Sequence, residues 1–456
     1  MLHSLVELFR CPNSAGAGER CGGRLEEQAS RLACVRCGAI FPCLSGIPVV
    51  LPDAASVVLD WRANLEEFSA ISNHVGSDLL TAISTSERLG PLKRERLTRL
   101  RDGLAAQAVE TLAAFAAAGL EARPRTAEPS PYSMKFGVLH YQHHIHRDWA
   151  WGDSEIAQAR AQMAQVWPAK RKLGRALFLG VGAARCAAEL SHEWQADLAV
   201  GIDTNPLPLL VAQTVLAGRA FNFHEVPSSP RSAHLPAIPR TLQGRADLGG
   251  NLQLVLADGL NPPFAQGSFD TVIADWFFDQ VVPDLEAYLP LVRSLMSENG
   301  VLLHHGPLVY PSTTPRSRRH TAEELFELLQ AAGFEVIAQT EAKLPFMESP
   351  DCNQGRVERV FSFTARLATP SPAPLNAIPN WLLSDDLPIP YFTGLDRYSP
   401  PHPFFGAVVA AIDGLRSCAE IASRIANQQK LSVSTVTVAV RAALREIHRI
   451  CQDRDG

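Results

Sequence analysis

Residues 166–368 alternate short apolar runs with amphipathic stretches, a pattern that predicts a parallel sheet with helices packed against it. Upstream, residues 53–165 carry apolar side chains at spacings of three and four, which predicts helices. A Pro/Ala-rich linker at 369–379 precedes residues 380–456, where two more helical patterns follow a glycine turn. Residues 1–52 instead hold five of the nine cysteines. We therefore expect a cysteine-rich unit, a helical region, an α/β domain, a linker and a C-terminal domain.

The overall composition is that of a soluble globular protein, with 46% hydrophobic and 20% charged residues among 456. The formal net charge of −5 argues against a broad surface for nucleic acid. No apolar run reaches the roughly 18 residues that a membrane-spanning helix needs, and the first residues lack the pattern of a signal peptide. We expect a cytoplasmic protein whose cysteines are thiols or metal ligands rather than disulfides.

A glycine-rich loop follows the first apolar run of the α/β region. Gly180 and Gly182 stand two apart in "FLGVGAARCAAEL", between a predicted strand and a predicted helix. Asp203 ends the next predicted strand, where a carboxylate can accept hydrogen bonds from a ribose diol. These residues alone suit a dinucleotide as well as S-adenosylmethionine (SAM).

Two further strands of this region also end in acidic residues. Asp258 ends "LQLVLAD" and Asp275 ends "FDTVIAD", which is followed by an amphipathic helix and by "NGVLLHHGPLVYP". This succession resembles class I methyltransferases, in which an acidic residue after the third strand meets the adenine amino group. The resemblance favours SAM over a dinucleotide.

A narrower resemblance covers residues 140–368. Here "HHIHRDWAWGDSE", the glycine loop, "GPLVY" and the C-terminal stretch of this region, "HTAEELFELLQAAGFEVIAQ", are similar to the carnosine N-methyltransferase family. The resemblance implies a Rossmann-like class I methyltransferase sheet, SAM as cofactor and methyl transfer to a nitrogen. The residues that it assigns to the cofactor are Arg147 for the carboxylate, Gly180 and Gly182 for the methionine moiety, Asp203 for the ribose, Asp258 for the adenine, and Asp275 with Trp276 beside the cofactor.

The chain departs from this family at several positions. Ala184 replaces the third glycine of the loop, which costs little if position 184 is already helical. Glu286 is displaced by one position from the acidic substrate contact of the family, and Pro311 follows Tyr310 where the family has a histidine. These changes argue for an acceptor other than carnosine.

Two adjacent histidines precede the "GPLVY" turn at the carboxyl edge of the predicted sheet, where ligands of open α/β sheets bind. Strand alternation sends His304 and His305 to opposite faces, so one can face the acceptor while the other packs against a helix. The catalytic candidates are Glu286, His304, His305 and Tyr310, and Asp279 is a further pocket candidate. Because a neutral imidazole nitrogen is nucleophilic near pH 7, the acceptor can be an imidazole.

The N-terminal cysteines have the spacing of metal ligands. "CVRC" presents Cys34 and Cys37 to one tetrahedral ion, and Cys11 and Cys21 can complete a closed, structural zinc site. The stretch resembles the short zinc-ribbon proteins that accompany methyltransferases. Cys43 stands where that family has an apolar residue, so we leave it out of the ligand set. A ribbon without metal, with reduced buried thiols, is the alternative.

The C-terminal segment "DGLRSCAEIASRIA" resembles a helix of PqqD-like winged-helix domains, which bind leader segments of modified peptides. This resemblance points to a peptide substrate or a partner protein; a helical cap packed on the sheet is the alternative. Three functions remain open for the chain. They are a SAM-dependent N-methyltransferase acting on a small molecule or a peptide, an adaptor with a degenerate methyltransferase fold, and an RNA methyltransferase, which the net charge disfavours.

Overall fold

The computed structural model describes residues 3–13, 20–29, 31–86, 88–126, 130, 137–280, 282, 284–312, 314–368, 379–392, 394–400 and 402–453. The predicted linker at 369–379 lies outside these residues except for its last position.

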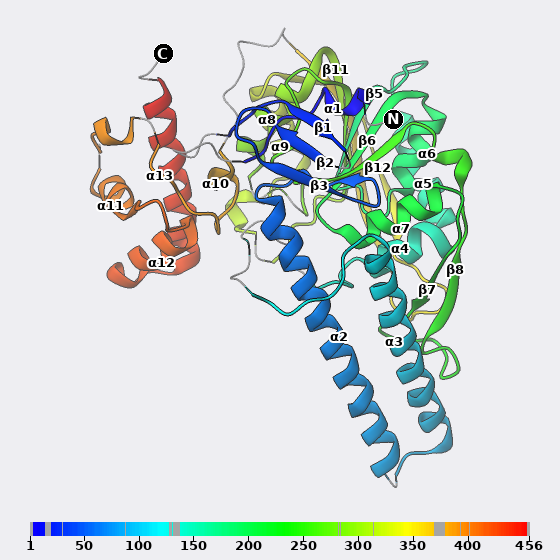
Figure 1. Ribbon diagram of the computed structural model, residues 1–456. Coiled ribbons are helices and arrows are strands. Elements are labelled where there is room, and N and C mark those ends of the chain that lie inside the picture. Colours follow the sequence, from blue (N-terminus) through cyan, green and yellow to red (C-terminus); the bar gives the residue numbers. More distant parts are fainter. Residues whose placement is uncertain are drawn as a thin grey trace.

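A seven-stranded sheet forms the centre of the molecule (Figure 1). Its strands are β5 (Gly174–Leu179), β6 (Ala196–Asp203), β9 (Leu252–Leu256), β10 (Phe269–Asp275), β11 (Met296–Gly306), β12 (Phe334–Phe346) and β13 (Arg356–Leu367). Their order is β12-β13-β11-β10-β5-β6-β9, and β13 runs antiparallel to both neighbours. Counted from β5 as the first strand, this order is 3-2-1-4-5-7-6. A dinucleotide-binding sheet has the order 3-2-1-4-5-6. The predicted mostly parallel, Rossmann-like α/β sheet is confirmed.

Helices cover both faces of this sheet. α5 (Asp153–Val166), α6 (Arg185–Glu193) and α7 (Pro206–Leu216) lie on one face, and α8 (Leu285–Leu295) and α9 (Ala322–Ala331) on the other (Figure 1). Their starts are marked in the sequence. The Asn205 side chain accepts a hydrogen bond from the Leu207 N–H, and Thr321 with Glu324 forms a capping box at α9. α7 therefore begins just beyond the carboxyl end of β6.

The helical region ahead of the sheet contains a long arm and a short closing segment. α2 (Ala54–Thr85) and α3 (Pro91–Ala117) form a helical hairpin that projects from the body (Figure 1). The closing segment is α4 (Gln142–His146) followed by the π-helix η1 (Arg147–Trp151). A two-stranded insertion, β7 (Phe221–Glu225) and β8 (Ile238–Leu242), packs against α3. Short 3-10 turns occur at η2 (Ala246–Leu248) and η3 (Arg316–Arg318).

The cysteine-rich segment packs on the open edge of the sheet. It contains α1 (His3–Val6) and the strands β1 (Leu25–Gln28), β2 (Arg31–Cys34), β3 (Ile40–Leu44) and β4 (Ile47–Pro48). Just after β4, the Val50 N–H donates to the Leu256 carbonyl of β9 at 2.8 Å. The segment shares one hydrophobic core with the sheet. It therefore covers an edge strand whose backbone groups would otherwise be unpaired.

The C-terminal domain has a hydrophobic core of its own, separate from that of the sheet. Its elements are α10 (Asn380–Leu383), η4 (Leu395–Arg397), α11 (Pro403–Ala411), α12 (Cys418–Gln429) and α13 (Val433–Asp453). The two predicted helices after a glycine turn are α12 and α13. No strand pair that could form the wing of a winged helix occurs among the described residues of 379–453. Between residues 379 and 453, as far as they are described, the one β-type pairing is the isolated Pro388–Ser417 bridge.

Charged side chains attach this domain to the start of α8. Arg445 of α13 pairs with Asp284, which also accepts a hydrogen bond from the Ala287 N–H as the cap of α8. Arg318 Nε lies 3.6 Å from the same carboxylate. Within the described part of the chain, no helix has the length and apolarity needed to span a bilayer.

The loop after β5 corrects one expectation. Ala184 has φ 65° and ψ 8° and caps α6 from the left-handed region, so position 184 is not helical. For a residue with a Cβ, this conformation costs about 1 kcal/mol or more. The alanine is therefore a strained substitute for glycine rather than a neutral one, and its near-complete burial holds it in place.

Candidate functional site

The glycine loop is shaped by one aromatic ring. Gly180 has φ +65°, and a Cβ there would lie 2.7 Å from Cδ2 of Phe277. A Cβ on Gly259, in the loop after β9, would lie 2.5 Å from Cζ of the same ring. By contrast, a Cβ on Gly182, at φ +55°, would meet nothing within 4 Å. The buried Phe277 ring thus sets the depth of both loops, while Gly182 faces open space.

Asp203 ends β6 and supports this loop. Its Oδ2 accepts a hydrogen bond from the Gly182 N–H and its Oδ1 accepts one from the Asn205 N–H, both at 2.9 Å. Burial raises the pKa of Asp203. Burial, followed by the negative charge of Asp203, also raises the pKa of Tyr141 to about 12. The phenol of Tyr141, immediately before α4, therefore lies near the carboxylate predicted to bind a ribose.

Asp258 follows β9 and begins a tight turn. Its Oδ1 accepts a hydrogen bond from the Leu260 N–H at 2.8 Å, and burial raises its pKa. The Tyr288 hydroxyl of α8 donates to the Gly259 carbonyl at 2.5 Å. This turn is fastened to α8 on one side and packed on Phe277 on the other.

The half-buried carboxylate of Asp275, at the end of β10, feels the charge of the Arg147 guanidinium. Asp275 Oδ1 is buried without a hydrogen-bond partner in the described structure. Burial raises the pKa of Asp275 to about 6, against the opposing effects of Arg147 and of a hydrogen bond from Cys186. Arg147 holds Asp148 Oδ1 through Nε at 2.9 Å and Nη2 at 2.7 Å. A cationic group and an anionic group of one ligand can be bound side by side here.

The closing segment is joined to the glycine loop. The Trp149 indole N–H donates to the Ala183 carbonyl at 2.8 Å, and Arg185 Nη1 donates to the Asp148 carbonyl at 2.9 Å. This arrangement holds the "RDW" residues over the start of α6. π-helical turns such as η1 are frequent at functional sites.

Sequence reasoning missed an aromatic wall beside Asp275. Trp276, at φ +51°, stacks on Phe346 with ring centroids 3.9 Å apart. Arg147 and Arg356 place their guanidinium carbons 5.5 and 4.8 Å from the Phe346 centroid, and His144 meets its edge. A left-handed conformation at a bulky residue marks local strain, which clusters at functional sites. Phe346 is the last residue of β12 and belongs to no recognisable motif, so the sequence alone did not indicate its position beside Trp276.

The two histidines of β11 point to opposite faces, as alternation predicts. His304 lies between Phe278 and Phe363, with centroids 5.0 and 5.1 Å away, and is completely buried. Burial lowers its pKa to about 3. The ring of His304 is enclosed by the core, so its packing favours a structural role, and its role as a catalytic candidate stays a prediction.

His305 lies on the side of Arg147. Its Nδ1 is 2.8 Å from the Ser362 hydroxyl, and burial, then the charge of Arg147, lowers its pKa to about 3. The ring is therefore neutral at pH 7.

The remaining candidates form a second group. Glu286 is exposed on α8, and its charge acts on His320. The Tyr310 ring meets His320 edge to face, with centroids 6.4 Å apart. Asp279 is 1% exposed; its Oδ2 accepts from the Val309 N–H, and its Oδ1 is without a partner in the described structure. The charge of Asp279 acts on Tyr310, and a Cβ on Gly306, next to His305, would lie 3.6 Å from Asp279 Oδ1 and 3.5 Å from Cα of Trp276.

The four predicted metal ligands are brought together. The sulfurs of Cys11, Cys21, Cys34 and Cys37 all lie within 4.8 Å of one another, with Cys11–Cys37 at 3.7 Å and Cys21–Cys34 at 3.6 Å. A tetrahedral site with Zn–S bonds of about 2.3 Å requires S–S distances of about 3.8 Å. Burial alone would raise the pKa of the Cys34 thiol. Hydrogen bonds from the backbone N–H groups of Cys37 and Arg36 outweigh this effect and lower the pKa to about 7. The donor set and geometry fit a structural zinc ion.

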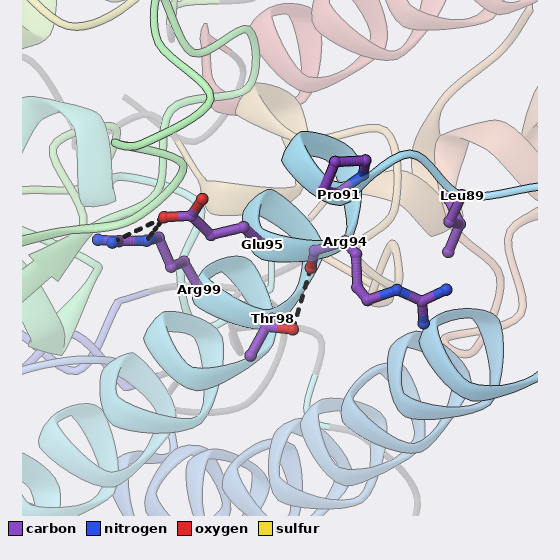
Figure 2. A pocket seen from close by; sticks show the side chains of 6 residues that line it. All are labelled: Leu89, Pro91, Arg94, Glu95, Thr98 and Arg99. Carbon is purple, nitrogen blue, oxygen red and sulfur yellow. Dashed lines mark hydrogen bonds and ion pairs between the residues drawn. The ribbon is translucent and has the colours of Figure 1, made fainter.

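The helical hairpin of α2 and α3 contains a hollow that lies outside the site described above. Figure 2 shows it at the start of α3, lined by Leu89, Pro91, Arg94, Glu95, Thr98 and Arg99. Arg99 pairs with Glu95 at 2.9 Å, and the Thr98 hydroxyl donates to the Arg94 carbonyl at 3.0 Å. Glu95 is paired with Arg99, and Arg94 donates to the backbone carbonyls of Ile83 and Ser86, so the hollow lacks the convergent unpaired groups found beside Asp275.

Comparison with known proteins gives distant likenesses only. No family model and no curated protein matches the chain. It is similar to a SAM-dependent methyltransferase from Methanosarcina mazei, at 17% identity and TM-score 0.30, over 43% of this chain and 93% of that one. A chain from the complex of the Haloferax volcanii Trm112 methyltransferase activator with a methyltransferase shares 14% identity, at TM-score 0.35, over 52% and 100%. The Burkholderia thailandensis 1,6-didemethyltoxoflavin-N1-methyltransferase shares 17%, at TM-score 0.31, over 54% and 100%. Likenesses this distant assign no activity to the chain.

We expect Gly180→Ala to destabilise the protein by about 3 kcal/mol, through left-handed strain and the clash with Phe277. Gly182→Ala adds only the strain and should cost about 1–2 kcal/mol. Chemical denaturation measures both. In a Phe277→Ala background, which removes the ring from Cγ outwards, the excess cost of Gly180→Ala should disappear; an unchanged excess would mean that the ring does not set the loop.

Metal content tests the cysteine cluster. Cys37→Ser should abolish a stoichiometric zinc ion measured by inductively coupled plasma mass spectrometry, because it removes one of four ligands. Cys43→Ser is the matched control and should retain the metal, since Cys43 is not among the clustered sulfurs. Equal zinc in both variants would contradict the assignment.

The raised pKa of Asp275 makes its contribution to stability depend on pH. Its pKa in the folded state exceeds the unfolded value, so the charge becomes costly as the pH rises through about 6. Asp275→Asn should therefore raise the free energy of unfolding at about pH 8 by up to about 3 kcal/mol. The gain should shrink towards pH 4, as urea titrations at several pH values can show. A gain independent of pH would point to packing instead.

Proposed function

We propose that this chain is a SAM-dependent methyltransferase that transfers a methyl group to a nitrogen of a small molecule or a peptide. One observation carries the proposal: Gly182 faces open space in a loop that Asp203 supports, on a sheet in which Asp258 follows β9 and Asp275 ends β10. Loops of this kind bind nucleoside cofactors at the carboxyl edge of α/β sheets.

The buried charges match the methionine end of this cofactor. An amino acid carries an ammonium and a carboxylate on one carbon, and it needs an acceptor and a donor side by side. Asp275 Oδ1 is the unpartnered acceptor, and Arg147 is the adjacent donor. A guanidinium suits the carboxylate because it can donate two parallel hydrogen bonds. In this proposal Asp203 binds the ribose and Asp258 the adenine.

The nitrogen acceptor is proposed from the groups beside Trp276. SAM supplies a methyl group on a positively charged sulfur, and transfer requires the acceptor to be held in line behind the methyl carbon. The stacked Trp276–Phe346 wall can orient a flat acceptor such as an imidazole. The unpartnered Asp279 Oδ1 can accept a hydrogen bond from an acceptor N–H. His305, neutral at pH 7, contributes a polar edge rather than an acid.

Glu286 and Tyr310, which lie around His320, are proposed as outer contacts of the acceptor. The C-terminal domain is attached at Asp284, two residues before Glu286, and this placement supports a role in presenting a peptide or partner protein. Zinc is proposed as a structural ion of the ribbon. The intact set of cofactor residues counts against a degenerate adaptor.

Isothermal titration calorimetry tests the cofactor directly. The full chain should bind SAM and S-adenosylhomocysteine at one site and should not bind NAD⁺. Asp203→Asn should weaken binding by about tenfold, because an amide replaces the charged ribose acceptor. Asp197→Asn, at the exposed other end of β6, is the matched control and should leave the affinity unchanged. No binding of either sulfur compound would overturn the proposal.

A methyl-transfer assay with the same protein preparations tests which chemical class accepts the methyl group. Transfer of a labelled methyl group to histidine-containing peptides or to amines should fall at least about tenfold in Asp279→Asn, while the affinity for S-adenosylhomocysteine is unchanged. Methyl transfer to oxygen or carbon, identified by mass spectrometry of the product, would contradict the nitrogen assignment.

A further inference from the structure

The cysteine-rich segment of residues 1–52, called the ribbon below, contacts the turn that carries Asp258. The Arg10 N–H donates to the Pro263 carbonyl and the Ala265 N–H donates to the Leu8 carbonyl, both at 2.8 Å. Phe9 stacks on Phe264 with centroids 5.6 Å apart. The loop of residues 258–265 is thus paired with the ribbon along its second half.

One ribbon side chain enters the first half of this loop. Arg20 Nη1 donates to Asn261 Oδ1 at 3.2 Å and to the Pro262 carbonyl at 3.1 Å. Its other nitrogens donate to carbonyls of the ribbon itself, with Nε on Cys11 at 3.2 Å and Nη2 on Arg10 at 3.2 Å. Arg20 therefore bridges the backbone of a zinc ligand and the side chain of Asn261.

This contact decides which way the Asn261 amide points. A guanidinium can only donate, so the amide must turn its oxygen towards Arg20 and its nitrogen away from it. Asn261 is 4% exposed, and its Nδ2 is buried without a partner in the described structure. An unsatisfied buried donor costs about 1–3 kcal/mol, which a ligand acceptor would recover.

Asn261 and Asp258 belong to the same turn, since the Asn261 N–H donates to the Asp258 carbonyl at 3.0 Å. The turn thus offers a carboxylate acceptor and an amide donor. Adenine carries the complementary pair on one edge, an amino group that donates and the adjacent ring nitrogen N1 that accepts.

We propose that Asn261 is a cofactor-binding residue whose Nδ2 donates to N1 of the adenine, and that Arg20 of the ribbon is the positioning residue that orients it. The inference rests on the proposed function, because it takes the adenine to lie at Asp258. It gives the ribbon a part in cofactor recognition through a single side chain.

The test compares S-adenosylhomocysteine with S-inosylhomocysteine, in which oxygen replaces the amino group and N1 carries a hydrogen. Asn261→Asp keeps the oxygen facing Arg20 but replaces the donor with an acceptor. Calorimetry should show S-adenosylhomocysteine binding at least about tenfold more weakly, and the preference for adenine over hypoxanthine should fall by about tenfold. A merely structural role would not change this preference.

The second variant tests the positioning role. Arg20→Met should weaken S-adenosylhomocysteine binding about tenfold with zinc content unchanged, and Arg20→Lys, which retains a donor, should recover part of it. Arg31→Met, on the exposed face of the ribbon, is the matched control.

The outcomes are distinguishable. If the wild type binds S-adenosylhomocysteine but Asn261→Asp keeps both affinity and base preference, the inference is wrong and the proposed function stands. If the wild type binds neither compound, both are wrong.

Discussion

The buried ring of Phe277 lies between the two loops on which the candidate cofactor site depends. It leaves no room for a Cβ at Gly180 or at Gly259, so both loops must approach it as bare backbone. Phe277 follows β10, whereas the loops follow β5 and β9. The ring therefore ties three strand ends to one another. Asp258 and Asp275 belong to two of these strand ends, and Asp203 is joined to the third by the hydrogen bond that it accepts from the Gly182 N–H.

Segments from other parts of the chain hold these loops in place through hydrogen bonds. The closing segment holds the glycine loop through Trp149 and Arg185, and the ribbon holds the Asp258 turn through Arg20. The ribbon can do this because it already pairs with the edge strand β9 and shares its core. Metal binding by four cysteines would stabilise the segment from which Arg20 reaches the turn, since small ribbons depend on their ion for folding.

Many of the strands, the glycine loop and the cysteine cluster could be predicted because short sequence patterns specify them. Strand-ending acidic residues, glycine spacing and the "CVRC" knuckle are short patterns, and the structure has the strands and the clustered sulfurs where they were expected. Alternation also separated His304 from His305, but it cannot say which one faces the core; that depends on Phe278 and Phe363, which flank His304. Phe346 and Asn261 escaped notice because their partners lie far away in sequence. Ala184 was misjudged because its backbone conformation follows from the loop, not from the residue, and the predicted wing rested on one helix pattern.

The central claim, that a nucleoside cofactor binds between these strand ends, is tested most directly by hydrogen exchange with and without S-adenosylhomocysteine. We predict new protection in residues 141–151, 180–185, 203–205 and 258–265 together, with none at the start of α3. An absence of protection, or protection confined to the α3 hollow, would contradict it.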